Sequence, residues 1–300
     1  MVDERLKIFV TVVDEQHFTK AAEKLLISQP NVSIALKKLE ETYGTTLLIR
    51  SSKSVKLTPT GERLYVRAKQ ILALYEQIHT EIDTLHNHVQ GKLHIGASFS
   101  IGEYLVPNML HDVYTDFPNL EVEVTIANTE EIVQKVANLD VEFGFIEGKT
   151  EHKDVWVQPF MEDELRIAAS RHHPLLARAT IDIQDLYGQA WVMRERGSGT
   201  RNYFDEFLFK HHIQPKSVTT IGSNQGVKEA VMRNLGLSIL SKHVIQQDVE
   251  RGTLVVIPLD AVKMQRMFSF ISSKISSTSR NEQAFVHVLN ERWGTTIKEW

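Results

Sequence analysis

The sequence predicts a mostly helical winged helix-turn-helix at the N-terminus, a long linking helix, and an α/β domain behind it. Two helical patterns separated by a tight turn fill residues 19–44, an apolar seam follows over residues 64–89, and strand and helix patterns alternate from residue 92 onward. The 300 residues, 42% hydrophobic and 24% charged, suit a globular protein of two or more domains.

The turn motif consists of two short amphipathic helices. The first is expected to begin at a Thr19 cap, and its apolar positions recur at helical spacing: Ala21, Ala22, Leu25 and Leu26. The second is expected to begin at a Ser28 cap, to carry Pro30 in its first turn, and to end at Gly44. Its buried stripe is Val32, Leu36 and Leu39. An earlier helix with Leu6, Phe9, Val10 and Val13 completes a three-helix core.

The polar face of this motif suits DNA. Donors suited to phosphates and base edges are Gln29, Asn31, Ser33, Lys37 and Lys38, and the further candidate DNA contacts of the motif are Thr19, Ser28 and Pro30. The β-rich residues 45–57 predict a short hairpin wing, with Arg50, Ser52 and Lys53 as further DNA contacts. Although the whole chain has a net charge of −4, residues 20–69 are basic, so the positive field is local.

Thr58 and Pro59 predict the start of a long helix. A heptad seam runs along it, and the candidate dimerisation residues are Leu64, Ala68, Ile71, Tyr75, Ile78, Ile82 and Leu85, with Val89 at its end. A helix of this length, about 45 Å, is too long to bury its stripe on a small winged domain. We therefore expect the seam to pair with a second copy, and the alternative is packing along its own chain.

Beyond Gly91 the pattern predicts a parallel, doubly wound sheet. Strands are expected over residues 92–97, 120–126, 143–146 and 164–170 and near Trp191 and Val218, and helices over residues 104–117, 129–139, 200–210, 225–234 and 280–292. Four turns that precede helices carry Ser, Thr, Asn or Gly: residues 97–102, 128–129, 197–201 and 223–226. Such turns bind anions through backbone N–H groups, and they also serve as plain helix caps.

The first sixty residues resemble the N-terminal signature of LysR-type transcriptional regulators. The resemblance lies in residues 18–25, Ser28-Gln29-Pro30, Ser33, residues 39–41, Gly44 and residues 57–61. His17, Ile34 and Leu48 depart from that pattern, and Ile34 suits a thymine methyl or packing. The rest of the chain resembles the two-lobed, periplasmic-binding-protein-like effector domain of the same family.

The resemblance implies a division into four parts. These are a DNA-binding domain over residues 1–58, a linker helix over 59–90, a first lobe over 91–161 and 268–300, and a second lobe over 162–267. It also implies a small, anionic effector between the lobes. The candidate contacts are Ser98, Ser100, Thr129, Glu147, Gly199, Thr200 and Asn224. Arg194, Arg196 and Arg201 can supply compensating charge.

Glu147 would oppose a fully charged anion. Either it points away, or the ligand brings a proton or a donor group. Residues 195–201 resemble regulators of sulfur assimilation, which suggests a sulfur oxyanion such as sulfite or sulfate.

Enzymatic and metal sites are not expected. Gly197-Ser198-Gly199 lacks the flanks of a nucleophile elbow, the histidines have no carboxylate at metal-ligand spacing, and the sequence contains no cysteine. We expect no cofactor, no secretory segment and no membrane span, and hence a cytoplasmic protein. The expected partners are double-stranded promoter DNA, the effector, one or three further copies in a homodimer or homotetramer, and RNA polymerase. The alternatives are a solute-binding protein and an α/β enzyme with an appended DNA-binding module.

Overall fold

The computed structural model describes residues 3–50, 55–84, 89–259, 262–276 and 278–298. Contacts divide the chain into a first unit, Met1–His88 with Asn138–Asp140, and a second unit, Val89–Ala137 with Val141–Trp300. Among the described residues, no helix is both long and apolar enough to cross a membrane.

The first unit contains the predicted helix-turn-helix. Its elements are α1 (Glu4–Glu15), α2 (Phe18–Lys24), α3 (Gln29–Tyr43), β1 (Leu48–Arg50), β2 (Val55–Leu57) and α4 (Pro59–Thr84). Phe9, Val32 and Leu36 are fully buried in a core shared by the first three helices. The strands β1 and β2 pair antiparallel as the predicted wing.

The caps of α3 are those expected from the sequence, but that of α2 is not. Ser28 Oγ accepts from Asn31 N at 3.4 Å, and Gly44 ends α3 with a φ of 63°. The cap of helix α2 lies two residues earlier than predicted, because His17 Nδ1 accepts from Thr19 N at 3.2 Å. Thr19 therefore lies in the first turn of α2 and is exposed. A histidine ring nitrogen can accept the same orphan N–H that a capping serine accepts.

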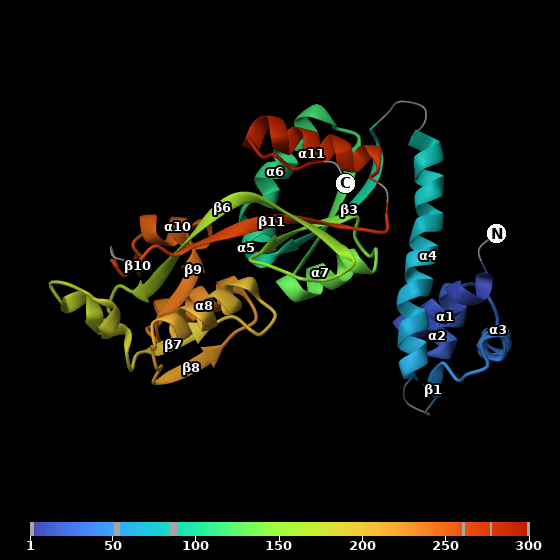
Figure 1. The fold of residues 1–300 in the computed structure, drawn as a ribbon, viewed down its shortest axis with the longest axis horizontal. Helices are drawn as coiled ribbons and strands as arrows, with labels where there is room; N and C mark the ends of the chain where they lie inside the picture. Colours follow the sequence, from blue (N-terminus) through green and yellow to red (C-terminus); the bar gives the residue numbers. More distant parts are fainter. Residues whose placement is uncertain (1–2, 51–54, 85–88, 260–261, 277, 299–300) are drawn as a thin grey trace. The chain divides into compact units, whose positions relative to one another are not determined.

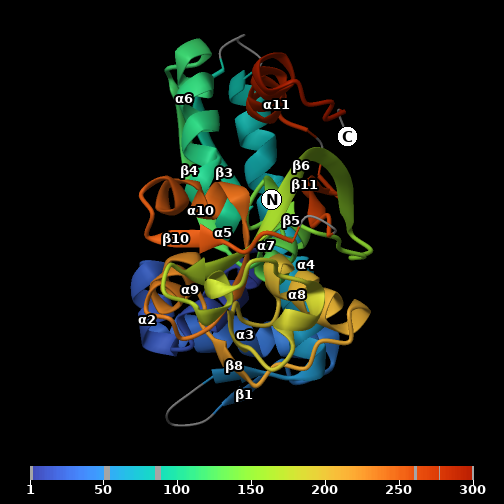
Figure 2. The same cartoon turned by 90° about the vertical axis from the view of Figure 1, so that its left-hand side faces the viewer.

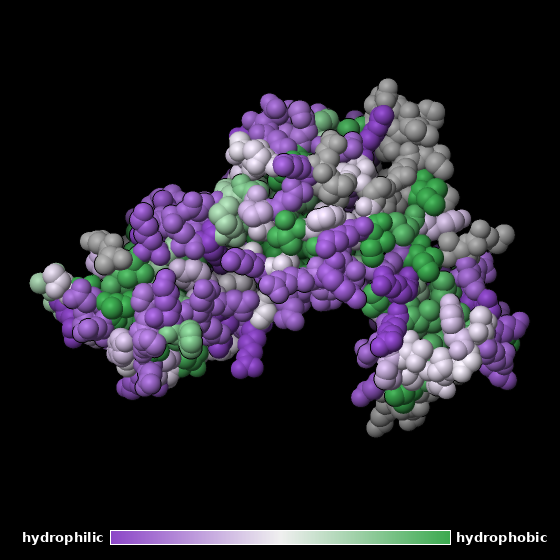
Figure 3. Space-filling model, viewed as in Figure 1, coloured by the Kyte–Doolittle hydropathy of each residue, from purple (hydrophilic) through white to green (hydrophobic). Residues whose placement is uncertain are grey.

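The predicted apolar seam on α4 lies partly in the core of the first unit and is partly exposed. Ala68 is completely buried in the core of the first unit, which corrects the expectation that it faces a second copy, and Leu64 packs against the same core while remaining partly exposed. Tyr75 is half-buried. Ile71 and Ile78 are 45% and 50% exposed, and Figure 3 shows apolar side chains over this part of α4. The side chain of Ile82, and Leu85 entirely, lie outside the described residues.

The second unit has two lobes. The first is built from β3 (Gly91–Ser98), α5 (Phe99–Tyr104), α6 (Val106–Asp116), β4 (Leu120–Ala127), α7 (Thr129–Ala137), β5 (Phe143–Glu147) and α11 (Arg280–Trp293). The second contains two 3-10 turns (Pro174–Ala177 and Ile183–Leu186), β7 (Ala190–Met193), α8 (Gly199–Lys210), β8 (Ser217–Thr220), α9 (Asn224–Met232), β9 (Ser238–Ser241), α10 (Lys242–Glu250) and β10 (Leu254–Val256). Two long strands, β6 (Val155–Ser170) and β11 (Gln265–Ser273), run between the lobes.

The sheet is mixed, not parallel as predicted. Strand β3 pairs parallel with β4 and β5, whereas β11 pairs antiparallel with β5 and β6. Strand β6 then pairs antiparallel with β9 and β10 in the second lobe. Alternating strand and helix patterns indicated the parallel part correctly. They did not reveal that β6 and β11 cross between the lobes. The resemblance, however, implied lobe boundaries after Met161 and before Phe268, and these two residues lie opposite each other on the crossing strands.

Each lobe has its own core. In the first, α6 and α11 lie side by side on one face of the sheet, with α7 on the other face (Figures 1 and 2). Phe143, Phe145, Phe270 and Phe285 form an aromatic cluster there. In the second, Trp191 packs against Phe204. The predicted helix over residues 104–117 corresponds to α6, whereas the short helix α5, which ends at Tyr104, was not predicted.

Candidate functional site

The candidate DNA-contacting side chains of α3 lie on its solvent side. Gln29, Pro30, Asn31, Lys37 and Lys38 are exposed, and Ser33 is half-buried. Gln29 Nε2 donates to Ser33 Oγ at 3.0 Å, which places these two polar groups together.

Two further placements bear on DNA recognition. Ile34 is 54% exposed on the side of α3 away from the buried stripe, so it does not serve packing within the first unit. Arg50 ends β1, but its side chain lies outside the described residues, and so do Ser52 and Lys53 at the wing tip.

Five of the seven predicted effector contacts meet in one buried hydrogen-bonded group. We call this group, with the additional residues described below, the interlobe cluster: Ser100, Thr129, Glu147, Asp163, Gly199, Thr200, Ser241 and Arg266. Its centre is the Glu147 carboxylate at the end of β5. Ser100 N donates to Oε1 at 2.8 Å, and Thr200 Oγ1 donates to Oε2 at 2.8 Å. Glu147 therefore points into the site and not away from it.

Arg266 on β11 supplies the positive charge of the cluster. Its Nη1 donates to Glu147 Oε2 at 2.8 Å and its Nε to Asp163 Oδ2 at 2.7 Å. The side chains of Arg266, Glu147 and Asp163 are only 4%, 2% and 0% exposed. Ser241 Oγ donates to the other Asp163 oxygen at 2.6 Å.

The two carboxyls respond differently to this arrangement. Burial alone raises the pKa of Glu147, but the Arg266 charge and the hydrogen bonds from Ser100 and Thr200 outweigh it, so its pKa lies below the usual value. For Asp163 burial is the stronger effect, and its pKa is raised despite Arg266 and Ser241. Glu147 is thus the carboxyl that holds its negative charge most firmly at neutral pH.

The lobes approach each other closely at Gly199, in the first turn of α8. A Cβ atom there would lie 2.3 Å from the carbonyl oxygen of Glu147, so only glycine fits. Gly199 N donates to Thr129 Oγ1 at 3.2 Å, and Thr129 Oγ1 donates to Glu147 O at 3.3 Å. The end of β5 and the starts of α7 and α8 are held together in this way.

Asn224 lies in a neighbouring group. Its Oδ1 accepts from Arg194 Nη1 at 3.0 Å, and its Nδ2 donates to Glu103 of the first lobe at 3.4 Å. Arg194 is 1% exposed, stacks on Phe99 with 4.2 Å from Cζ to the ring centroid, and also pairs with Glu195.

The other two candidate arginines do not contact the interlobe cluster. Arg196 is exposed. Arg201 Nε donates to Asp205 at 2.9 Å.

Ser98 is the last predicted effector contact. It precedes α5 and is 1% exposed, yet its hydroxyl caps nothing and has no hydrogen-bond partner among the described residues. Because an unpaired buried hydroxyl costs about 1–3 kcal/mol, this oxygen is available to a ligand.

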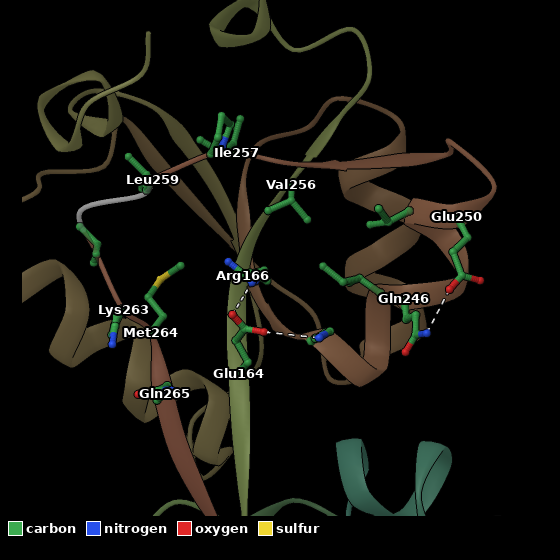
Figure 4. Close-up of a pocket in the computed structure, with 15 residues that line it drawn as sticks. Glu164, Arg166, Gln246, Glu250, Val256, Ile257, Leu259, Lys263, Met264 and Gln265 are labelled. Carbon is green, nitrogen blue, oxygen red and sulfur yellow. Dashed lines mark hydrogen bonds and ion pairs between the residues drawn. The ribbon is translucent and has the colours of Figure 1, made fainter.

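The second unit contains several hollows. One of about 330 Å³ borders the interlobe cluster and is lined by Thr129, Lys149, His152, Gly197 and Asn202, among others. A larger one of about 750 Å³ lies in the second lobe (Figure 4). Glu164 there pairs with both Arg166 and Lys242, and none of the predicted effector contacts lines it.

Sequence reasoning missed Arg266, Asp163 and Ser241. Arg266 lies on β11 and Asp163 at the middle of β6, in segments that carry no turn motif, whereas Ser241 ends β9 and caps α10. Residues 264–267, Met-Gln-Arg-Met, do not alternate between apolar and polar side chains, so the sequence carries no strand signal at Arg266. Within the described ranges, no three His, Asp or Glu side chains are grouped so that they could hold a metal ion.

Comparison with known proteins identifies the family. The profile described as "Bacterial regulatory helix-turn-helix protein, lysR family" matches residues 4–62, and "LysR substrate binding domain" matches residues 86–294. The chain belongs to the LysR family. It is 46% identical to the HTH-type transcriptional regulator CysL of Bacillus subtilis over 292 residues, 97% of this chain and 98% of CysL. It is thus a transcriptional regulator with a DNA-binding and an effector-binding domain, as predicted, and its relatives are regulators rather than enzymes.

Solved LysR-family structures show the same fold. A full-length OxyR variant from Pseudomonas aeruginosa covers 100% of this chain, with 99% of its own chain matched, a TM-score of 0.74 and 23% identity. The regulatory domain of Synechocystis CcmR in complex with 2-PG covers 67% of this chain and 96% of its own, with a TM-score of 0.62 and 28% identity.

Proposed function

We propose that this LysR-family regulator binds promoter DNA sequence-specifically through α3 and the wing, and that a small anion at the interlobe cluster controls it. The observation that supports an effector site is the buried Ser98 hydroxyl, which has no hydrogen-bond partner among the described residues. Ser98 lies two residues before Ser100 of the interlobe cluster, and a free hydroxyl donor suits an oxyanion. Binding to DNA implies a cytoplasmic protein.

The cluster offers a mechanism for control. Ser100, Thr129 and Glu147 come from the first lobe and Gly199 and Thr200 from the second, so a ligand among them changes how the lobes meet. It can shift the equilibrium between two arrangements only as far as its affinities for them differ. We propose that the shift alters the spacing of DNA readers in a dimer or tetramer, and so affects DNA bending or RNA polymerase contact.

We propose that the exposed part of the α4 seam joins two copies. Ile71 and Ile78 are one heptad apart, and each is about half exposed in the single chain. Paired readers require half-sites separated by about one DNA helical turn.

Replacing Lys37 by Ala should weaken binding to a selected operator several-fold. The slope of log affinity against log salt concentration should also become shallower by about one. Lys37 is exposed, and its only described ion pair is with Glu41, at 3.9 Å. Fluorescence anisotropy at several salt concentrations measures both quantities. The matched control is Lys92→Ala, an exposed lysine on β3 in the second unit. Equal slopes for wild type and Lys37→Ala would remove this contact from the proposal.

For the effector we propose a sulfur oxyanion such as sulfite or sulfate. The resemblance of residues 195–201 to regulators of sulfur assimilation and the relationship to CysL support this choice. Addition of the correct anion to the full chain should raise its melting temperature, because at about 100 times Kd a ligand adds about 2.7 kcal/mol to the free energy of unfolding. Chloride at equal ionic strength is the control. If no sulfur oxyanion raises the melting temperature, the effector assignment is wrong, while the DNA-binding function stands.

A further inference from the structure

An apolar side chain lies in the middle of the exposed face of α3. Ile34 is 54% exposed and belongs to the second turn of this helix. At 3.6 residues per turn, it lies about 160° around the helix axis from both Val32 and Leu36, which are buried. The Ile34 side chain therefore points away from the core of the first unit and into the space that a ligand of α3 would occupy.

The residues around Ile34 on this face are polar. Lys37 and Lys38 lie one turn after it, Asn31 lies one turn before it, and all three are exposed. Glu41 follows on the same face, 3.9 Å from Lys37. Two lysines and one glutamate give the face a net positive charge, which suits the phosphate backbone of DNA. A second copy that presented the same face would bring like charges together, so DNA is the favoured occupant.

The position of Ile34 in the motif places it near base edges. In a helix-turn-helix the second helix enters the major groove, and residues near its N-terminus contact the bases. Helix α3 is the second helix of the motif that matches the LysR-family profile, and Ile34 lies in the N-terminal half of this helix.

The chemistry of isoleucine selects among those base edges. In the major groove the bases present hydrogen-bond donors and acceptors, and thymine adds a methyl group at C5. Isoleucine has no side-chain donor or acceptor, so it matches the methyl group. Over cytosine the same side chain would cover the N4 amino group without accepting its hydrogen bond, which carries a penalty. Attraction to thymine and the penalty at cytosine therefore act in the same direction.

We propose that Ile34 is a specificity-determining residue, which selects thymine at one position of each half-site by contact with the C5-methyl group. The inference rests on the proposed function, in which α3 binds promoter DNA sequence-specifically. Contacts from Lys37 and Lys38 to phosphates would position the helix but carry no sequence information, whereas the Ile34 contact supplies it.

The test starts from an operator that the full chain selects out of random DNA. Each thymine of one half-site is then replaced singly by deoxyuridine, which removes the methyl group and keeps the base-pairing edge. Fluorescence anisotropy at constant salt concentration measures the affinity for each operator. At one thymine we expect wild type to lose about fourfold in affinity, the loss that corresponds to one buried methyl group.

Ile34→Ala shows whether Ile34 is the side chain that contacts this methyl group. Alanine is favoured in a helix, so α3 should be retained. We expect weaker binding to the unmodified operator and no further loss when deoxyuridine replaces that thymine. Lower salt concentration strengthens binding and keeps the affinities of this variant measurable. The control Leu235→Ala shortens an apolar side chain of similar exposure, 49%, in the second unit and should retain the wild-type pattern.

Two results would overturn the inference and leave the proposed DNA-binding function intact. One is a wild type that binds every deoxyuridine operator as tightly as the unmodified one. The other is an equal loss at each thymine in wild type and in Ile34→Ala, because another side chain would then contact the methyl group. If wild type selects no sequence from random DNA, the proposed sequence-specific binding is wrong and the inference fails with it.

Discussion

Replacing Arg266 by Met should lower the free energy of unfolding by about 3–5 kcal/mol at neutral pH. The change leaves Glu147 and Asp163, whose side chains are 2% and 0% exposed, without their shared guanidinium. The free energy of unfolding falls because two buried carboxylates must either remain charged without a partner or take up a proton. Chemical denaturation of the full chain measures the loss.

The sign of the pH dependence follows from the same cluster. In wild type the lowered pKa of Glu147 contributes stability that is present at neutral pH and lost as pH falls. Without Arg266 both carboxyls have raised pKa values, so the deficit of the variant should be largest near pH 7 and shrink toward about pH 5. The control is Arg233→Met, since Arg233 and its partner Glu229 are 66% and 45% exposed and a surface pair of this kind contributes only about 0.3–0.5 kcal/mol. A deficit independent of pH would show that the carboxylates do not cause it.

Replacing Gly199 by Ala should destabilise the second unit by about 1–3 kcal/mol and weaken effector binding at least tenfold. The added Cβ would lie 2.3 Å from Glu147 O, so the start of α8 must move away from β5. That movement stretches the Thr200–Glu147 and Gly199–Thr129 hydrogen bonds. Alanine is otherwise favoured over glycine in a helix by about 1 kcal/mol, so a loss of stability isolates the steric effect.

The matched control for this prediction is Gly222→Ala. A Cβ at Gly222 would have its nearest neighbour 4.0 Å away, at Glu195 Oε2. Thermal unfolding and anion titration of the two variants measure both effects. A Gly199→Ala chain as stable as wild type would contradict the close contact between α8 and β5.

The local elements were largely readable from the sequence because their signals are local. Caps, turn glycines and helical spacing lie within a few residues of one another, and α3, α8 and α11 have nearly the predicted bounds. The cap of α2 was assigned to Thr19 because serine and threonine dominate such positions, whereas histidine performs this role here.

The site was readable in part, for a related reason. Ser100, Thr129, Gly199 and Thr200 lie in turns before helices, where backbone N–H groups are free, and the fold brings those turns together. Arg266 has no such signal, because nothing near it in the chain shows that β11 passes the end of β5. The sequence also did not show that part of the α4 seam packs on the chain's own core. A heptad pattern looks the same whether its apolar residues face a partner helix or the rest of the same chain.

The passage of β11 and α11 back into the first lobe has a consequence for synthesis. The core of that lobe combines Leu93 and Phe143 with Phe270, Phe285 and Leu289. The ribosome therefore makes its first strands early but supplies its closing strand and helix last, whereas the core of the second lobe draws on the uninterrupted stretch from Leu165 to Met264. During translation the second lobe can complete its core first, and the first lobe exposes apolar surface until the C-terminus is released. Truncation before β11 would thus remove part of the core of a lobe that begins far earlier in the chain, at β3.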